Sequence, residues 1–172
     1  MNTLDEVIDK LHLQPLTSEG GMWAQTYRSS EIIPDGLIGD RVGDREICGS
    51  IYYLLTPQSF SSMHKLTGDE LWFHHLGPAL QFLIIYPDHS EIQILGSDIA
   101  NGEKPQLLIP RGTYFGAKMK EEGEFTLAST VMSPAYDDSD FESGSYELLE
   151  PLLTDSQHKN LLKQLTGQIK YL

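Results

Sequence analysis

Residues 61–77, SSMHKLTGDELWFHHLG, gather three histidines, two adjacent acids and a tryptophan in a short stretch. An imidazole beside a carboxylate can act as an acid–base pair, because the carboxylate orients the ring and stabilises its cation. The same side chains are also ligands for transition metals. The stretch therefore indicates a metal site, an acid–base pair in a pocket, or a half-buried polar hairpin.

Strand alternation separates these side chains into two faces. If residues 69–75 form a strand, Glu70, Trp72 and His74 share one face, and His75 lies on the other. A hairpin turn at Thr67–Gly68 is expected to bring His64 opposite the Glu70 face. Such a patch of convergent polar groups at the mouth of a β-barrel is typical of a small-molecule site.

The elements that must position this patch are mostly strands. Thr3 is expected to cap a short amphipathic helix, which Pro15 ends. Helical spacing of apolar residues returns near the C-terminus, at about 145–166. Between them, short apolar or alternating runs recur every 8–12 residues or so, which is typical of a sandwich or barrel. We expect one domain over 1–172, with the barrel core at about 20–136.

Five segments in this order resemble the cupin superfamily, and most closely a group of small single-domain cupins once catalogued as a domain of unknown function. The segments are EGGMWAQTYRS (19–29), SIYYLL (50–55), SFSSMHKLTGDELW (59–72), LGSDIANGEKPQLLIPRGTYFGA (95–117) and DSDFE (138–142). The resemblance implies an all-β fold, a double-stranded β-helix or jelly-roll cupin barrel. It also implies a homodimer.

The resemblance also exposes a departure from the metal-binding cupin pattern. The four ligand positions of that pattern fall on Ser62, His64, Glu70 (or Asp69) and Phe115, so one histidine and one acid remain. Three protein ligands are the usual minimum for such a metal. We therefore expect no metal and no cofactor; if a metal does bind, its ligands would be His64, Glu70 and His74.

Without a metal, the similarity extends to deoxysugar epimerases, in which a pocket histidine removes a proton next to a carbonyl and a tyrosine returns one. His64 and Glu70 are the catalytic candidates on this comparison. Tyr27, Tyr53 and Tyr136 are candidate acids, and nothing in the sequence chooses among them. The expected ligand-binding residues are Glu19, Tyr27, Trp72, His74 and Phe115.

Composition excludes several other classes. The net charge of −13 disfavours nucleic acids and anionic membrane surfaces as partners. A single cysteine, Cys48, allows no internal disulfide and no multi-cysteine zinc site. The N-terminus MNTLDEVIDK lacks the apolar stretch of a signal peptide, so we expect a cytoplasmic protein.

Three functions stay open. The first is a pocket that binds a small polar metabolite, sugar-like or nucleotide-like, and acts as a metal-independent isomerase or epimerase through His64. The second is a metal-dependent cupin dioxygenase or isomerase. The third is a non-catalytic binding module.

Overall fold

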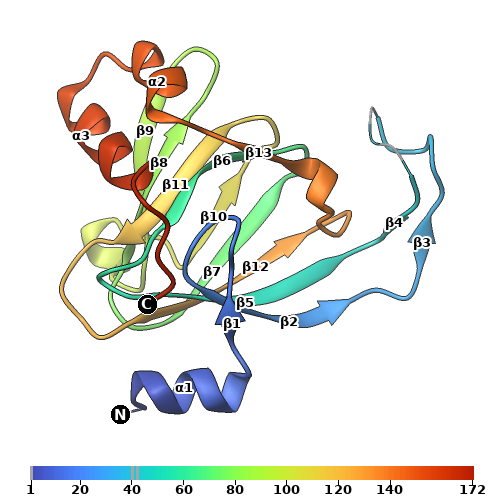
Figure 1. Ribbon diagram of the computed structural model, residues 1–172, viewed down its shortest axis with the longest axis horizontal. Coiled ribbons are helices and arrows are strands. Elements are labelled where there is room, and N and C mark those ends of the chain that lie inside the picture. Colours follow the sequence, from blue (N-terminus) through green and yellow to red (C-terminus); the bar gives the residue numbers. More distant parts are fainter. Residues whose placement is uncertain (1, 40, 42) are drawn as a thin grey trace.

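Two antiparallel sheets face each other in the computed structural model (Figure 1), which describes residues 2–39, 41 and 43–172. The six-stranded sheet has the order β1 (Gln14–Pro15), β2 (Met22–Arg28), β5 (Gly49–Leu55), β12 (Thr126–Met132), β7 (Glu70–Leu76) and β10 (Gln106–Ile109). The five-stranded sheet has the order β13 (Phe141–Ser143), β6 (Ser61–Leu66), β11 (Tyr114–Met119), β8 (Leu80–Ile85) and β9 (Ser90–Leu95).

The core between the sheets is built on aromatic side chains. Tyr53, Trp72 and Phe82 are at most 1% exposed, and Trp72 meets both other rings edge-on at centroid distances of 5.3 and 5.0 Å. Both faces of strand β8 are buried. Phe82 and Ile84 point into this core, and Leu83 and Ile85 on the outer face pack against the C-terminal helices.

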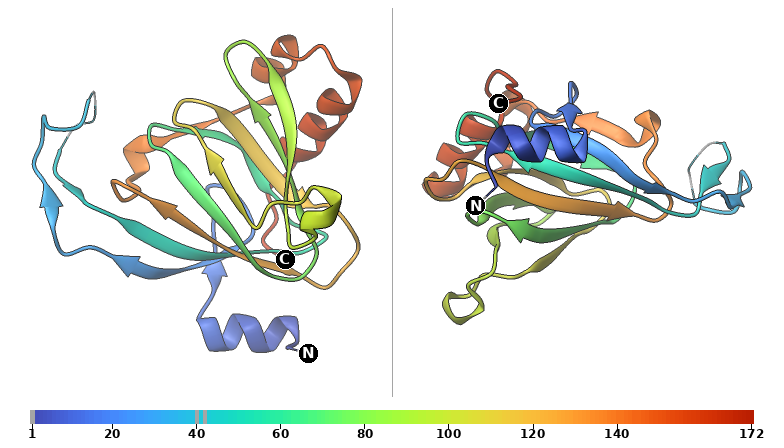
Figure 2. Two further views of the ribbon diagram at one scale, coloured as in Figure 1. Left: turned by 180° about the vertical axis from the view of Figure 1, so that it is seen from behind. Right: turned by 90° about the horizontal axis from the view of Figure 1, so that it is seen from below.

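Helices cover the outer faces of both sheets (Figure 2). The helix α1 (Leu4–Leu11) packs on the six-stranded sheet, and α2 (Tyr146–Leu149) and α3 (Ser156–Leu165) pack on the five-stranded sheet. Short 3-10 turns lie at Ile99–Asn101 (η1), Asp138–Asp140 (η2) and Glu150–Leu152 (η3). This confirms the prediction of an all-β fold with a short N-terminal helix and C-terminal helices.

The helix ends follow the local sequence. Thr3 and Glu6 form a capping box, in which each side chain accepts a hydrogen bond from the other residue's backbone N–H. Asp155 caps α3 by accepting from the N–H groups of Gln157 and His158. The Thr3 cap was expected from the sequence, and the Asp155 cap begins α3 within the segment where helical spacing was expected.

The prediction of a hairpin at Thr67–Gly68 is wrong. Strands β6 and β7 lie in opposite sheets and do not pair with each other. The short link between them crosses from one sheet to the other, so that inward side chains of β6 and β7 face each other across the barrel interior. This crossing, and not a shared hairpin face, brings His64 near Glu70.

An arm of residues 29–48 leaves the barrel between β2 and β5 (Figure 1). Its only regular part in the described residues is the two-stranded pair of β3 (Ile32–Ile33) and β4 (Arg45–Glu46). Arg45 is buried and donates to Ser139 Oγ at 2.8 Å, which ties the base of the arm to the 137–140 turn. Among the described residues, no helix has the length and apolarity needed to traverse a lipid bilayer.

Candidate functional site

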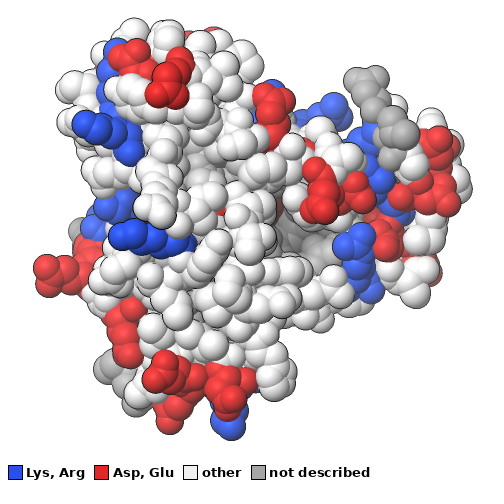
Figure 3. Space-filling view, in the orientation of Figure 1, with Lys and Arg blue, Asp and Glu red and all other residues white. Residues whose placement is uncertain are grey.

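A cavity of about 670 Å³ opens at the end of the barrel from which the arm leaves. Its walls come from β2, β5, β6, β7 and β12, from residues 16–19 and from residues 135–141. Figure 3 shows the surface hollowed between the barrel and the arm, with acidic and basic side chains gathered around the hollow. The size is that of pockets that enclose small ligands.

The loop that carries Glu19 is held tightly. Gly20 has a φ of 104°, and a Cβ there would lie 2.4 Å from the carbonyl oxygen of Phe60, so only glycine fits. The Tyr53 hydroxyl donates to the Gly20 carbonyl at 2.8 Å, and the Ser62 N–H donates to the Glu19 carbonyl at 2.8 Å. The loop geometry therefore fixes where the Glu19 side chain can reach.

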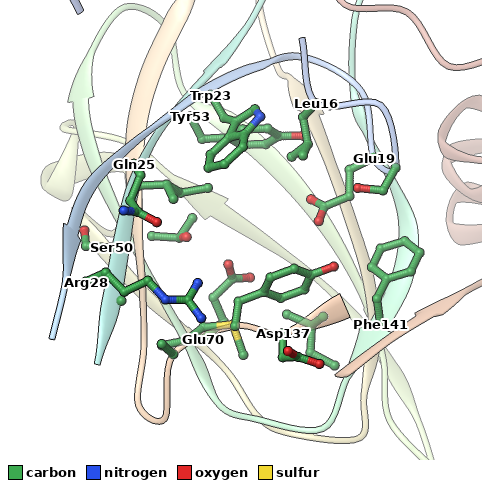
Figure 4. Close-up of a pocket in the computed structure, with 18 of the residues that line it drawn as sticks. Leu16, Glu19, Trp23, Gln25, Arg28, Ser50, Tyr53, Glu70, Asp137 and Phe141 are labelled. Carbon is green, nitrogen blue, oxygen red and sulfur yellow. The ribbon is translucent and has the colours of Figure 1, made fainter. Parts of the chain in front are cut away.

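The Glu19 carboxyl points into the cavity (Figure 4). Its side chain is 14% exposed and accepts no hydrogen bond from the described residues. Burial raises the pKa of Glu19 to about 7, because desolvation penalises the charged form. Glu19 is therefore a carboxylic acid that can gain or lose a proton near neutral pH.

His64 lies behind the cavity wall. Its ring is stacked on Phe141 at a centroid distance of 5.2 Å and touches Phe115 at 4.2 Å. Nδ1 donates to the Ser62 carbonyl at 2.7 Å, since a carbonyl can only accept, and this leaves Nε2 without a proton in the neutral ring. Desolvation lowers the pKa of His64, so the neutral ring is favoured at pH 7.

The free Nε2 of His64 lies next to the Glu19 carboxyl and within electrostatic reach of Glu70. It lies 3.9 Å from Glu19 Oε2, and its charge is coupled to that of Glu70. Burial first, and then repulsion from Glu19, raise the pKa of Glu70 to about 7. Trp72 Nε1 donates to Glu70 Oε2 at 2.7 Å, which orients that carboxyl and works against the rise. One imidazole and two neutral-pH acids thus converge at the inner end of the cavity.

The other residues named from the sequence are spread more widely. Trp72 lines the cavity, and Tyr27 lines it at the rim with 55% exposure. Phe115 is fully buried and does not line the cavity. His74 also lies outside the cavity lining, with Nε2 in a hydrogen bond to the Gly77 carbonyl at 3.0 Å. The β7 ladder keeps a regular register from Glu70 to His74, and its irregularity lies beyond His74, so the alternation itself holds. The cavity lining on β7 is Glu70 and Trp72, and His74 lies further along the strand.

The candidate tyrosine acids are now distinguishable. Tyr53 is engaged with the Gly20 carbonyl. Tyr136 lines the cavity, and burial together with the negative charge of Glu19 raises its pKa. Its proton is therefore retained at neutral pH, within the electrostatic reach of Glu19.

Several lining residues were not identified from the sequence as site residues. Trp23 and Gln25 lie two apart on β2, so alternation from Tyr27 was the signal that could have found them. Phe141 gave no local signal, because its place against His64 depends on the pairing of β13 with β6. Arg28 lines the cavity and donates to Glu46 at 2.7 Å, as an ion-pair partner does.

The donor set does not fit a cupin metal centre. The described part of the chain contains no group of three His, Cys, Asp or Glu side chains that could hold a metal ion. Phe115 offers no donor atom at the fourth ligand position, and His74 lies outside the cavity.

Comparisons with known proteins agree with this architecture. A family model described as "Cupin superfamily (DUF985)" matches residues 5–144. An uncharacterized protein of Saccharomyces cerevisiae, YML079W, is 30% identical over an alignment of 143 positions that covers 76% of this chain and 71% of the yeast protein. Among solved structures, a hypothetical protein from Leishmania major has a TM-score of 0.83 and 29% identity, over 97% of this chain and 100% of its own.

The protein SO0799 from Shewanella oneidensis has a TM-score of 0.82 and 34% identity, over 97% of this chain and 99% of its own. More distant cupin structures, at 13–16% identity and a TM-score of 0.55, share the fold alone.

Proposed function

Because this chain belongs to the cupin superfamily, in the family described as DUF985, we propose that its jelly-roll barrel binds a small polar metabolite and isomerises or epimerises it by metal-independent proton transfer. The chemistry would centre on the cluster of His64, Glu70 and Glu19, in which the two carboxyls line the cavity and the imidazole lies behind its wall. The family match confirms the resemblance noted in the sequence and the cupin barrel, and the reaction is our proposal.

One observation carries the proposal. Glu70, with a pKa of about 7, lines the cavity, and a neutral imidazole with a free nitrogen lies behind the cavity wall within electrostatic reach of it. A general acid or base is most effective when its pKa lies near the working pH, and each such group contributes roughly 10²–10⁴-fold. Proton transfer next to a carbonyl is the reaction that such a pair performs without a metal.

The walls support a ring-shaped polar ligand. The cavity is lined by the aromatic side chains of Trp23, Trp72 and Phe141, which offer flat surfaces for a sugar or base ring. Gln25 and Ser50 add neutral hydrogen-bonding groups on the side of the cavity opposite Phe141 (Figure 4). We therefore expect a sugar-like or nucleotide-like ligand.

Two further expectations belong to the proposal. By the resemblance to other small cupins, we propose that the protein is a homodimer of single-domain chains. We also propose that it is cytoplasmic. Sedimentation of the purified protein would show twice the chain mass of 19.3 kDa for a dimer, and the chain mass alone would contradict it.

The experiment is deuterium exchange into a metabolite panel. Chelator-treated protein is incubated in D2O with reducing sugars, their phosphates and sugar nucleotides, and loss of carbon-bound proton signals is followed by NMR. We expect exchange in at least one compound, unaffected by chelation and reduced roughly 10²–10⁴-fold in Glu70→Gln.

Other outcomes would contradict the proposal. Exchange that requires added metal would favour a metal-dependent cupin enzyme. Thermal stabilisation by a panel compound without any exchange would favour a non-catalytic binding module.

A further inference from the structure

We infer that Glu19 is the catalytic residue that exchanges the proton with the ligand, and that His64 is a positioning residue behind it. This inference rests on the proposed function, because it assigns the groups that would carry out the proton transfer. It starts from a mismatch between sequence pattern and structure: the histidine that the pattern places in the pocket does not line the cavity.

His64 is only 1% exposed, and a phenylalanine separates it from the cavity. The Phe141 ring lies nearly parallel to the imidazole, at an interplanar angle of 19°, and lines the cavity in its place. Phe115 closes on the imidazole as well, with the ring centroids 4.2 Å apart. A ligand in the cavity thus meets Phe141 and not the imidazole.

Glu19 has the properties that His64 lacks. Its carboxyl lines the cavity, points into it and accepts no hydrogen bond from the described residues (Figure 4). Its side chain is 14% exposed and its carboxyl faces the cavity, so a ligand there can reach the carboxyl directly. Glu70 differs, because one of its oxygens is already bound by the Trp72 N–H.

The backbone of Ser62 fixes the positions of Glu19 and His64 relative to each other. Its N–H donates to the Glu19 carbonyl at 2.8 Å, and its carbonyl accepts from His64 Nδ1 at 2.7 Å. This arrangement presents Nε2 to Glu19 Oε2 at 3.9 Å. A protonated Glu19 can turn its O–H toward Nε2, so the imidazole orients the carboxyl and accepts from its acid form.

The transfer balances with the two acids alone. The Glu19 carboxylate takes a proton from the carbon next to a ligand carbonyl, and the C–H electron pair forms the C=C bond of an enediol. The carbonyl oxygen takes its proton from the Glu70 carboxylic acid. For isomerisation, Glu19 delivers its proton to the former carbonyl carbon while the Glu70 carboxylate takes the proton of the hydroxyl on the first carbon, which becomes the new carbonyl. For epimerisation, Glu19 delivers its proton to the other face of the first carbon while Glu70 takes back the proton that it gave to the carbonyl oxygen. Both routes restore the Glu19 carboxylate and the Glu70 carboxylic acid.

The test uses the intact protein with four variants and the same metabolite panel in D2O. Glu19→Gln keeps size and shape but cannot carry the proton, and Glu19→Asp withdraws the carboxyl by one methylene. His64→Asn keeps the donor to the Ser62 carbonyl and removes Nε2. Glu142→Gln changes an exposed carboxyl and serves as the control. Thermal shift with the same compounds reports binding separately.

We expect Glu19→Gln to lose at least about 100-fold in exchange while ligand binding persists, and Glu19→Asp to lose less. His64→Asn should lose about tenfold and shift the pH profile of exchange, as a positioning role requires. Full exchange in Glu19→Gln would overturn the inference, and the proposed function would stand if Glu70→Gln then lost exchange.

If the wild-type protein exchanges no panel compound, the proposed function fails and the catalytic role of Glu19 fails with it. Infrared spectra then test the part of the inference that needs no ligand, the pairing of Glu19 with His64. A carboxylic acid C=O band at pH 6 that disappears in Glu19→Gln and shifts in His64→Asn would show Glu19 holding a proton against Nε2. Absence of a band assignable to Glu19 at that pH would overturn the inference.

Discussion

Replacing Glu19 with glutamine should stabilise the protein at alkaline pH and leave it unchanged in acid. Burial raises the pKa of Glu19 from 4.5 to about 7 in the folded state. Between these values the folded protein binds more protons than the unfolded chain, so this group makes stability fall as pH rises from about 4.5 to about 7. Glutamine has no proton to lose and removes that pH dependence.

The size of the effect follows from the shift. Each pKa unit corresponds to about 1.36 kcal/mol, so the shift of about 2.5 units costs the native protein about 3 kcal/mol above pH 8. The carboxyl is only 14% exposed, so solvent screens little of this cost. For a chain of this size, about 3 kcal/mol raises the midpoint of thermal unfolding by roughly 6–12 °C.

Urea unfolding of both proteins at pH 4 and pH 8.5 measures the prediction. The difference in the free energy of unfolding should be near zero at pH 4 and about 3 kcal/mol in favour of Glu19→Gln at pH 8.5. Glu142→Gln is the control, because Lys65 at 2.8 Å lowers the pKa of Glu142 and its loss should not stabilise. An equal difference at both pH values would refute the reasoning.

Three further predictions concern the supports of the site. Gly20→Ala should lower the free energy of unfolding in urea by at least about 2 kcal/mol, because the new Cβ would lie 2.4 Å from the Phe60 carbonyl oxygen at a positive φ. An unchanged free energy of unfolding would contradict the loop geometry. Trp72→Phe removes the N–H that favours ionised Glu70, so the pKa of Glu70 should rise further above about 7 in a carboxyl NMR titration; a lower value would count against it. Leu162→Ala should cost about 2–5 kcal/mol by thermal unfolding, because the side chain is fully buried between α3 and the five-stranded sheet, and a cost under about 1 kcal/mol would argue against that packing.

Much of the fold could be predicted because its signals are local. The capping box at Thr3 and the cap at Asp155 mark helix starts within a few residues. Alternation marks strands in the same way. Strand pairing is not local, and the turn at Thr67–Gly68 has the residues of a hairpin although the strands on either side of it enter different sheets.

The site divides along the same line. Alternation on β7 brought Glu70 and Trp72 to one face, and they meet there in a hydrogen bond. The place of Phe141 against His64 depends on β13 pairing with β6, about 75 residues earlier in the chain, and no local pattern reports it. The raised pKa values of the two acids come from burial, which a sequence does not give residue by residue.

The most direct test of the account is a carboxyl titration of protein labelled with carbon-13 in its glutamate side chains. We predict two signals that titrate near pH 7, one lost in Glu19→Gln and the other in Glu70→Gln. Titration of every glutamate signal at or below about pH 5, where exposed carboxyls titrate, would contradict the central claim that this cavity holds two acids ready to exchange protons at neutral pH.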